Sequence, residues 1–374
     1  MHILQVISGR EVNGAVTYVR FLARQLLRSG HAVTVLHRRD SWIGDHPVPG
    51  ARYVESELQR TPRELRRVAG LIQQNGIDLV HTHMSRAHFF GVLLRPLVKR
   101  PVVATAHSCR FQLHWPFNDF VIANSGSTLE YQRRFNLVKS ARSRTVYCFT
   151  DLQRFHQTTT EPASDVRRQL GLTDGNLLLG VVGQVGRRKG QKILFECLPD
   201  LFARFPGMHL AVVGEFERDW PYVRRLRAWQ RRNRLFRRIH WLGRRRNVED
   251  YMSAMDICAI PSLREPLGLV ALEALASGTP VVASNVGGLP EIVTHEQTGL
   301  LVPPNQPLLL LDAISELAAN APRRTEMGQR GRELVCRRFQ PEQLTAQVIG
   351  VYQQLLAACD TTVRRPVDCK RTAA

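Results

Sequence analysis

Apolar, β-rich runs alternate with amphipathic helical patterns along most of the chain. Runs such as HILQVIS (2–8), HAVTVLH (31–37) and IDLVHTH (77–83) are short and rich in branched residues. Between them, one helical pattern extends from Gly14 to Arg28. A second extends from Thr61 to Asn75, where a capping box opens the helix and Gly76 follows it. Repeated alternation of this kind predicts a parallel sheet covered by helices.

A second series of the same kind follows a polar stretch over residues 151–164, which we interpret as the interdomain linker. It opens with LLLGVVG (177–183) and continues through HLAVVGE (209–215), IHWLG (239–243), DICAIPS (256–262), TPVVAS (279–284) and GLLVP (299–303). We therefore predict an α/β protein with two doubly wound, Rossmann-like parallel-sheet domains, 1–160 and 161–340, facing a cleft. Residues 341–374 are predicted to form a helix that returns toward the first domain and a basic tail.

Composition favours a water-soluble enzyme of the reducing cytosol. Apolar residues make up 44% and charged residues 22% of the 374 residues, as in ordinary globular proteins. The seven cysteines include no C-x-x-C pair that would hold zinc, and no export signal or membrane-spanning run is apparent. We expect a cytoplasmic protein.

The net charge of +20 is concentrated in one segment, because twelve arginines lie between Arg218 and Arg246. Tyr222, Leu226 and Trp229 recur at helical spacing, which predicts a basic helix with one apolar face. A solvated helical face is the commoner explanation of such a run. Contact with the anionic inner face of the cytoplasmic membrane is an alternative, and nucleic-acid binding is a less favoured one.

The most informative chemistry lies between Glu265 and Glu273, two carboxylates eight positions apart where a strand-end loop meets an apolar helix. A carboxylate at Glu273 would be partly buried and would need hydroxyl donors, such as those of a ribose diol. The helix start at Gly268 to Val270 offers unpaired amides that suit a diphosphate.

The order of these motifs resembles the glycogen-synthase-like, group 1 retaining glycosyltransferases of GT-B architecture. The resemblance is carried by E-P-L-G-L-V-A-L-E (265–273), ASGTPVVASNVGGLPEIV (276–293) and TGLLVP (298–303). It extends to GVVGQVGRRKG (180–190) and to NGAVTYVRFLARQL (13–26), so it covers most of residues 1 to 340.

The resemblance implies a role for each matching position of the second domain. Glu273 would hold the donor ribose, and Glu265 would contact the transferring sugar. The amides of Gly268 and Leu269, and of Val270 beside them, would hold phosphate.

The family also places an arginine and a lysine on the diphosphate. Lys189 matches the lysine, but Gln184 stands where the arginine is expected. Arg187 or Arg188 would then help Lys189 to stabilise the leaving group.

Fewer positions of the first domain match, and their implied roles concern the sugar and the acceptor. His107 would face the transferring sugar. His83 and Asn13 would lie on the acceptor side, and Gly14 would let the first loop approach the donor phosphate. No D-x-D pair occurs in the sequence, so we predict no metal ion and no cofactor beyond the donor itself.

The predicted function is transfer of a sugar, with retention, from a nucleotide diphosphate to a hydroxyl group. A UDP-sugar is favoured over a GDP- or ADP-sugar. The acceptor would be a glycan or lipid-linked molecule of cell-envelope polysaccharide, lipopolysaccharide or glycolipid synthesis. A sugar-nucleotide 2-epimerase of the same fold and a catalytically weakened binding or scaffold protein remain open alternatives.

Overall fold

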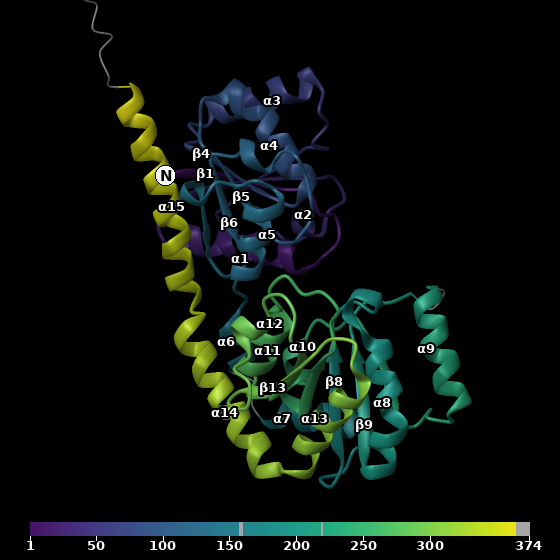
Figure 1. Cartoon of the computed structure of the whole chain (residues 1–374). Helices are drawn as coiled ribbons and strands as arrows, with labels where there is room; N and C mark the ends of the chain where they lie inside the picture. The colour runs from purple at the N-terminus through teal and green to yellow at the C-terminus, as the bar shows by residue number, and fades with distance from the viewer. Residues whose placement is uncertain (157–159, 218–219, 364–374) are drawn as a thin grey trace, which may run out of the picture. The chain divides into compact units, whose positions relative to one another are not determined.

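The computed structural model describes residues 1–156, 160–217 and 220–363, and these form two compact units (Figure 1). The first unit comprises Met1–Asn124, Leu129–Val146 and the chain from Glu342 onward. The second comprises Ser125–Thr128 and Tyr147–Pro341. The basic tail predicted at the C-terminus, including Arg364, Arg365, Lys370 and Arg371, lies outside the described residues.

The first unit is built on a parallel sheet in the order β3-β2-β1-β4-β5-β6-β7. Its strands are β1 (His2–Ile7), β2 (Ala32–His37), β3 (Arg52–Glu55), β4 (Leu79–His83), β5 (Val102–Ala106), β6 (Phe120–Ala123) and β7 (Ser143–Thr145). Because all neighbouring strands pair in parallel, their carboxyl ends lie at one edge of the sheet.

Helices connect these strands and cover both faces of the sheet. They are α1 (Gly14–Arg28), α2 (Trp42–Asp45), α3 (Pro62–Gln74), α4 (Ser85–Val98), α5 (Gly126–Phe135) and α15 (Pro341–Val363), with short 3-10 turns η1 (Trp115–Phe117) and η2 (Ser140–Arg142). Alternate strand residues such as Leu4 and Val80 pack with Phe90 of α4 in one apolar core. Gln5 and His81 point to the opposite face, because successive strand residues alternate between faces.

The second unit contains a parallel sheet in the order β10-β9-β8-β11-β12-β13. Its strands are β8 (Leu177–Val182), β9 (Met208–Val213), β10 (Ile239–Gly243), β11 (Ile257–Ile260), β12 (Val281–Ser284) and β13 (Gly299–Val302). Its helices are α6 (Leu152–His156), α7 (Thr160–Gln169), α8 (Gln191–Arg204), α9 (Pro221–Arg232), α10 (Val248–Ala254), α11 (Leu269–Ala276), α12 (Leu289–Ile292), α13 (Pro307–Ala319) and α14 (Ala321–Arg338), with the 3-10 turn η3 (Arg187–Lys189).

Both sheets and their helices confirm the predicted fold class of two Rossmann-like α/β units followed by C-terminal helices. The helices predicted from Gly14 and from Thr61 form as α1 and α3. The Asn13 side chain caps the first, and the Thr61 side chain caps the second.

Three details differ from the sequence interpretation or add to it. The basic helix predicted over 218–246 is shorter, because α9 ends at Arg232 and Arg244–Arg246 follow strand β10; residues 218–219 lie outside the described chain. The polar stretch 151–164 contains α6 and the start of α7, both in the second unit, and residues 157–159 are not described. Over the residues that the structure describes, every helix is too short or too polar to cross a bilayer.

Candidate functional site

Glu265 is the centre of a charged cluster at the carboxyl edge of the second sheet. Its side chain is buried, with 9% of its surface exposed, and Lys189 Nζ donates a hydrogen bond to Glu265 Oε2 over 2.6 Å. Arg188 lies 3.6 Å from the other carboxylate oxygen, and the Ser262 hydroxyl donates to Oε2 over 3.2 Å. Two cations therefore balance one buried carboxylate and leave an excess of positive charge there.

Close backbone packing brings the loop carrying Lys189 against the loop that follows β11. Gly190 adopts φ +69°, and a Cβ atom added there would lie 1.8 Å from the Pro261 carbonyl oxygen. Only glycine tolerates both that conformation and that approach. The amide of Leu263 then donates to the Arg188 carbonyl over 2.9 Å. These constraints hold the ammonium of Lys189 within reach of Glu265.

Helix α11 begins directly after this cluster, and its first amide groups have no acceptor among the described residues. Gly268, its N-cap, has φ +102°, and an added Cβ would lie 2.6 Å from Leu289 Cδ2. Among the described residues, no protein acceptor is found for the amides of Gly268, Leu269 and Val270. The positive end of the helix thus meets the cationic cluster around Lys189, an arrangement suited to a multiply charged anion.

Glu273 lies one turn further along α11 and is half-buried. Burial raises its pKa to about 7, while a hydrogen bond from Thr150 and the charges of Lys189 and Arg154 act in the opposite direction. Thr150 Oγ1 donates to Glu273 Oε1 over 3.4 Å. A pair of ligand hydroxyl groups would satisfy the remaining acceptor positions of this carboxylate.

The other predicted donor-site residues lie in the same loop but contact the cluster less directly. Gln184 is exposed, and its carbonyl oxygen accepts from the Gln191 side chain over 3.2 Å. Arg187 is exposed too, and of the two neighbouring arginines it is Arg188 that reaches Glu265.

In the first unit, a chain of histidines, buried at His81 and His83 and half-buried at His107, lies on the face of the sheet opposite α4. His83 Nε2 is 2.6 Å from Gln5 Oε1, and His83 Nδ1 is 3.1 Å from His107 Nε2. His81 lies beside them, 2.6 Å from the Tyr352 hydroxyl of α15 and 2.7 Å from that of Thr105. The structure thus brings the predicted residues His83 and His107 into direct contact.

Burial and hydrogen bonding define the state of both histidines. Burial lowers the pKa of His107 to about 3 and that of His83 well below its ordinary value, so both are neutral at pH 7. Because the Gln5 oxygen only accepts, His83 carries its hydrogen on Nε2 and accepts at Nδ1. His107 therefore donates through Nε2 and has its lone pair on Nδ1. A neutral His107 can orient a hydroxyl group through a hydrogen bond, but it is not the protonated imidazolium that a general acid would require.

Asn13 and Gly14 occupy the start of α1. Asn13 Oδ1 accepts from the amides of Ala15 and Val16, at 3.0 and 3.2 Å, so this predicted acceptor-side residue caps the helix. Gly14 is the first helical residue and is exposed.

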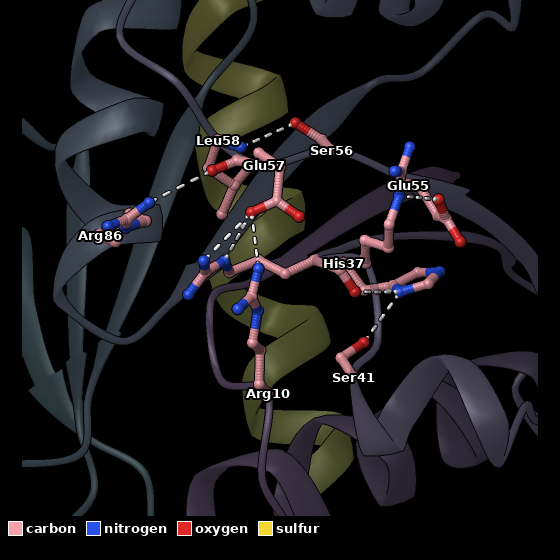
Figure 2. A network of polar contacts seen from close by, with 10 residues as sticks. Arg10, His37, Ser41, Glu55, Ser56, Glu57, Leu58 and Arg86 are labelled. Atoms are coloured by element: carbon pink, nitrogen blue, oxygen red, sulfur yellow. Dashed lines mark hydrogen bonds and ion pairs between the residues drawn. The ribbon is translucent and has the colours of Figure 1, made fainter.

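A second cluster at the carboxyl edge of the first sheet gathers arginines around Glu57 (Figure 2). Arg10 follows β1 and Arg38 follows β2, and each donates to Glu57 Oε2 over 3.1 Å. Arg86, at the start of α4, donates to the Glu57 carbonyl oxygen over 3.4 Å. Hydrogen bonds from Arg38 lower the pKa of Glu57. Two guanidinium groups therefore share the Glu57 carboxylate and a third contacts its backbone carbonyl oxygen, so the excess charge is positive.

No group of three or more His, Cys, Asp or Glu side chains with the spacing of a metal site exists within residues 1–156, 160–217 and 220–363. The groups at the second sheet that could hold an anion are amides and cationic side chains.

Comparison with known proteins identifies the family of this chain. Residues 163–334 match the family Glycosyl transferases group 1, and residues 12–154 match Glycosyltransferase Family 4. A lipopolysaccharide core biosynthesis mannosyltransferase, LpsB of Rhizobium meliloti, is 30% identical over 286 residues, which cover 71% of this chain and 76% of that protein. The chain belongs to the group 1 glycosyltransferases. A D-inositol 3-phosphate glycosyltransferase of Corynebacterium jeikeium is 29% identical to this glycosyltransferase over 363 residues, 85% of the chain and 86% of that protein.

Solved structures share the GT-B fold of this glycosyltransferase. Sucrose-phosphate synthase from Thermosynechococcus elongatus has a TM-score of 0.81 and 27% identity, covering 96% of this chain and 100% of that one. HepE from Anabaena, solved in complex with UDP, has a TM-score of 0.84 and 22% identity, covering 95% and 100%.

Sequence reasoning missed several partners in the sites of this glycosyltransferase. Ser262 precedes Glu265 by three residues, so its proximity could have been inferred from the loop. Thr150 is 123 positions from Glu273, and Gln5 is 78 positions from His83. No local sequence pattern predicts such contacts, because the residues come together only when the chain folds.

Proposed function

We propose that this glycosyltransferase moves a sugar, with retention of anomeric configuration and without a metal ion, from a nucleotide diphosphate to a hydroxyl group of an envelope glycan or glycolipid. The observation that carries the proposal is the meeting of the α11 amino terminus with Lys189 and Glu265. This arrangement offers helix amides and an ammonium group to one anion.

Each part of a nucleotide-sugar donor has a counterpart in the second unit. The ribose hydroxyls donate to Glu273, and the diphosphate accepts from the amides of Gly268, Leu269 and Val270. Lys189 adds a charge-assisted hydrogen bond to a phosphate oxygen while its contact with Glu265 keeps it in place. Glu265 is then adjacent to the transferring sugar and accepts from one of its hydroxyls.

Retention requires that the acceptor attack the face from which the diphosphate leaves. The bond between the anomeric carbon and phosphate oxygen breaks, and its electron pair stays on the diphosphate. The acceptor oxygen then forms the new bond on the same face, and the departing phosphate takes the acceptor's proton. The protein supplies no nucleophile; its part is to stabilise the leaving group and orient the sugar. On the first unit, His107, neutral and fixed in one tautomer by His83, suits the orientation of a substrate hydroxyl group.

Charge in the first unit favours an acceptor that carries a negative group. Arg10 and Arg38 from two loops and Arg86 from the start of α4 converge at the carboxyl edge of the sheet, where ligands of such sheets bind. Among the described residues, the carboxylate paired with Arg10 and Arg38 is that of Glu57. The name of the Corynebacterium relative specifies a phosphorylated acceptor, D-inositol 3-phosphate. A phosphate on this acceptor would accept bidentate hydrogen bonds from these arginines.

The donor and the stereochemistry can be tested together. A thermal-shift panel of UDP-, GDP- and ADP-sugars identifies the donor, and we expect the UDP-sugar to stabilise the protein most; HepE of the same fold binds UDP. With the donor in hand, proton NMR of the first product formed reports its anomeric configuration. An inverted product would refute retention, and absence of any shift in the panel would refute donor binding.

Inositol and D-inositol 3-phosphate are matched probes of the acceptor site. We expect the phosphorylated compound to be bound more tightly, and we expect the Arg10→Gln, Arg38→Gln double variant to weaken that binding by roughly tenfold or more, because charge-assisted hydrogen bonds are lost. The control is Arg63→Gln, Arg66→Gln, which changes exposed arginines of α3. Equal affinity for the two compounds would contradict the anionic acceptor.

A further inference from the structure

Helix α9 presents one face made almost wholly of arginine. The segment 220–248 contains eleven arginines and no Asp, Glu or Lys. Within it, α9 covers Pro221–Arg232, and β10 follows at the edge of the second sheet. This concentration of charge has no part in the donor site described above.

The inner face of α9 is fixed by packing and by one buried amide. Val223 and Leu226 are buried in the apolar core of the second unit. Gln230 donates to the carbonyl oxygens of Leu235 and Ile239, and the Trp241 ring nitrogen donates to Gln230 over 2.9 Å. The rotation of the helix about its axis is therefore set by groups that do not include the exposed arginines.

The helical period places four arginines on the side opposite this anchor. At 100° per residue, Arg224, Arg225, Arg231 and Arg232 centre about half a turn from Val223, Leu226 and Gln230. All four are exposed. Together with Pro221, Arg227 and Ala228, three of them line a shallow hollow of about 540 Å³.

The charge of this face is not neutralised by the protein. None of its four arginines has a carboxylate within ion-pair distance among the described residues. Other arginines of the segment are engaged internally. Arg227 stacks on Phe216 and Trp241, and Arg238 stacks on Phe202 while donating to three backbone carbonyls.

An exposed aromatic side chain follows the arginine face. The turn after α9 is closed by backbone hydrogen bonds from Arg234 and Leu235 back to the last turn of the helix. Phe236 comes next and is 60% exposed, between the exposed residues Arg234 and Arg237. Arginines beside an exposed aromatic group are the composition with which helices rest on anionic bilayer surfaces.

We propose that the arginine face of α9, with Phe236, docks this protein on the surface of an anionic phospholipid membrane. The guanidinium groups contact lipid phosphates, and the hollow between them admits a headgroup. A membrane suits these observations better than a nucleic acid does. Trp229 and Trp241 are partly buried against the core, so among the described residues of this segment Phe236 is the one largely exposed ring, whereas single-stranded nucleic acid is held by several stacking rings.

Vesicle co-sedimentation tests this surface. Wild-type protein is mixed with vesicles of phosphatidylcholine alone or of phosphatidylcholine with phosphatidylglycerol, at low and at high salt. We expect binding to the anionic vesicles only, with loss at high salt. Changing Arg224, Arg225, Arg231 and Arg232 to glutamine should lower the partition coefficient by more than about tenfold, because each basic residue adds to the attraction.

Two matched variants exclude a general effect of charge or a folding defect. Arg28, Arg63, Arg66 and Arg337 are exposed elsewhere on the chain, and changing these four to glutamine alters the net charge equally. We expect that variant to bind vesicles like the wild type. Changing the four α9 arginines to lysine keeps the charge and should keep most of the binding.

The proposal would be overturned if neutral and anionic vesicles were bound equally, or if the α9 and control glutamine variants lost vesicle binding equally. It would also be overturned if, in a parallel RNA-retention assay, the α9 glutamine variant lost RNA binding while its vesicle binding stayed unchanged. The proposed membrane contact is inferred from the charge of α9 and does not depend on the proposed glycosyl transfer. Donor-induced thermal shifts of the α9 variants, which we expect to equal those of the wild type, distinguish its failure from that of the proposed function.

Discussion

Glu273 couples the protonation of one carboxyl group to folding and, under the proposed function, to donor binding. Its pKa rises from 4.5 to about 7 because burial disfavours the charged form. A raised pKa in the folded state means that this group stabilises the fold fully below pH 4.5, and that this contribution is lost as the pH rises through 7. A ribose diol, which donates hydrogen bonds, favours the charged carboxylate and so acts in the opposite sense.

Donor affinity should therefore increase as the pH rises through about 7, although the unliganded fold loses stability over the same range. A nucleotide-sugar is a suitable ligand because its diphosphate does not titrate near neutrality. Calorimetric titration at several pH values measures the trend. In Glu273→Gln the affinity should be lower and should no longer depend on pH in this window. An unchanged pH profile in this variant would show that another group is responsible.

Lys189 and Glu265 form a buried ion pair whose members depend on one another. Replacing Lys189 by methionine leaves the carboxylate with the Ser262 hydroxyl and the longer contact to Arg188 as its partners, so we expect a loss of about 3 kcal/mol in the free energy of unfolding. Adding Glu265→Gln should recover much of that stability and yet leave transfer reduced by roughly a hundredfold, because the leaving group still lacks its cation. Denaturant unfolding and initial rates separate the two effects. If transfer recovered together with stability, Lys189 would have a structural role alone.

Sequence reasoning was most successful where the candidate site residues lie within a few positions of one another in the chain. The predicted loop from Glu265 to Glu273 does begin a helix at Gly268, and Lys189 does lie at the same edge of the sheet. It could not foresee that Lys189 pairs with Glu265, since 76 positions separate them. It also could not foresee that the side-chain oxygen of Asn13 accepts hydrogen bonds from the first amides of α1 and so caps that helix.

At the scale of elements, helix α11 can begin where it does because its N-cap is glycine. Gly268→Ala would force a side chain into φ +102° and against Leu289. We expect a cost of about 1–3 kcal/mol and a large loss of donor affinity, because the amides of the first turn would shift. Gly350→Ala is the control, since an added Cβ at that position of α15 meets nothing within 4 Å. Equal donor affinity in both variants would remove α11 from the binding account.

Periodicity predicted most strands and the long helices, because burial on one face leaves a repeating pattern. It overestimated the basic helix, since arginine is a good helix former and the arginines continue past Arg232, where α9 ends; the run IHWLG was itself predicted and forms β10. The short strands β3 and β7 have only four and three residues, which is too few to show a period.

At the scale of the whole molecule, one chain carries two parallel sheets whose carboxyl edges both bear excess positive charge. One edge has Lys189 and Arg188 around Glu265, and the other has Arg10, Arg38 and Arg86 around Glu57. With a net charge of +20, anionic substrates and any anionic surface are attracted over a distance that shortens as salt increases. The account therefore predicts anionic ligands at each of these places.

The central claim is that helix amides and Lys189 hold the donor diphosphate without a metal ion. Its most direct test is the thermal shift produced by the preferred nucleotide-sugar in excess EDTA, compared between wild type and Lys189→Met. We predict a full shift in the wild type, equivalent to about 2.7 kcal/mol at a hundred times the dissociation constant, and a much smaller shift in the variant. A wild-type shift that vanishes in EDTA and returns with magnesium, or one that Lys189→Met leaves unchanged, would contradict the claim.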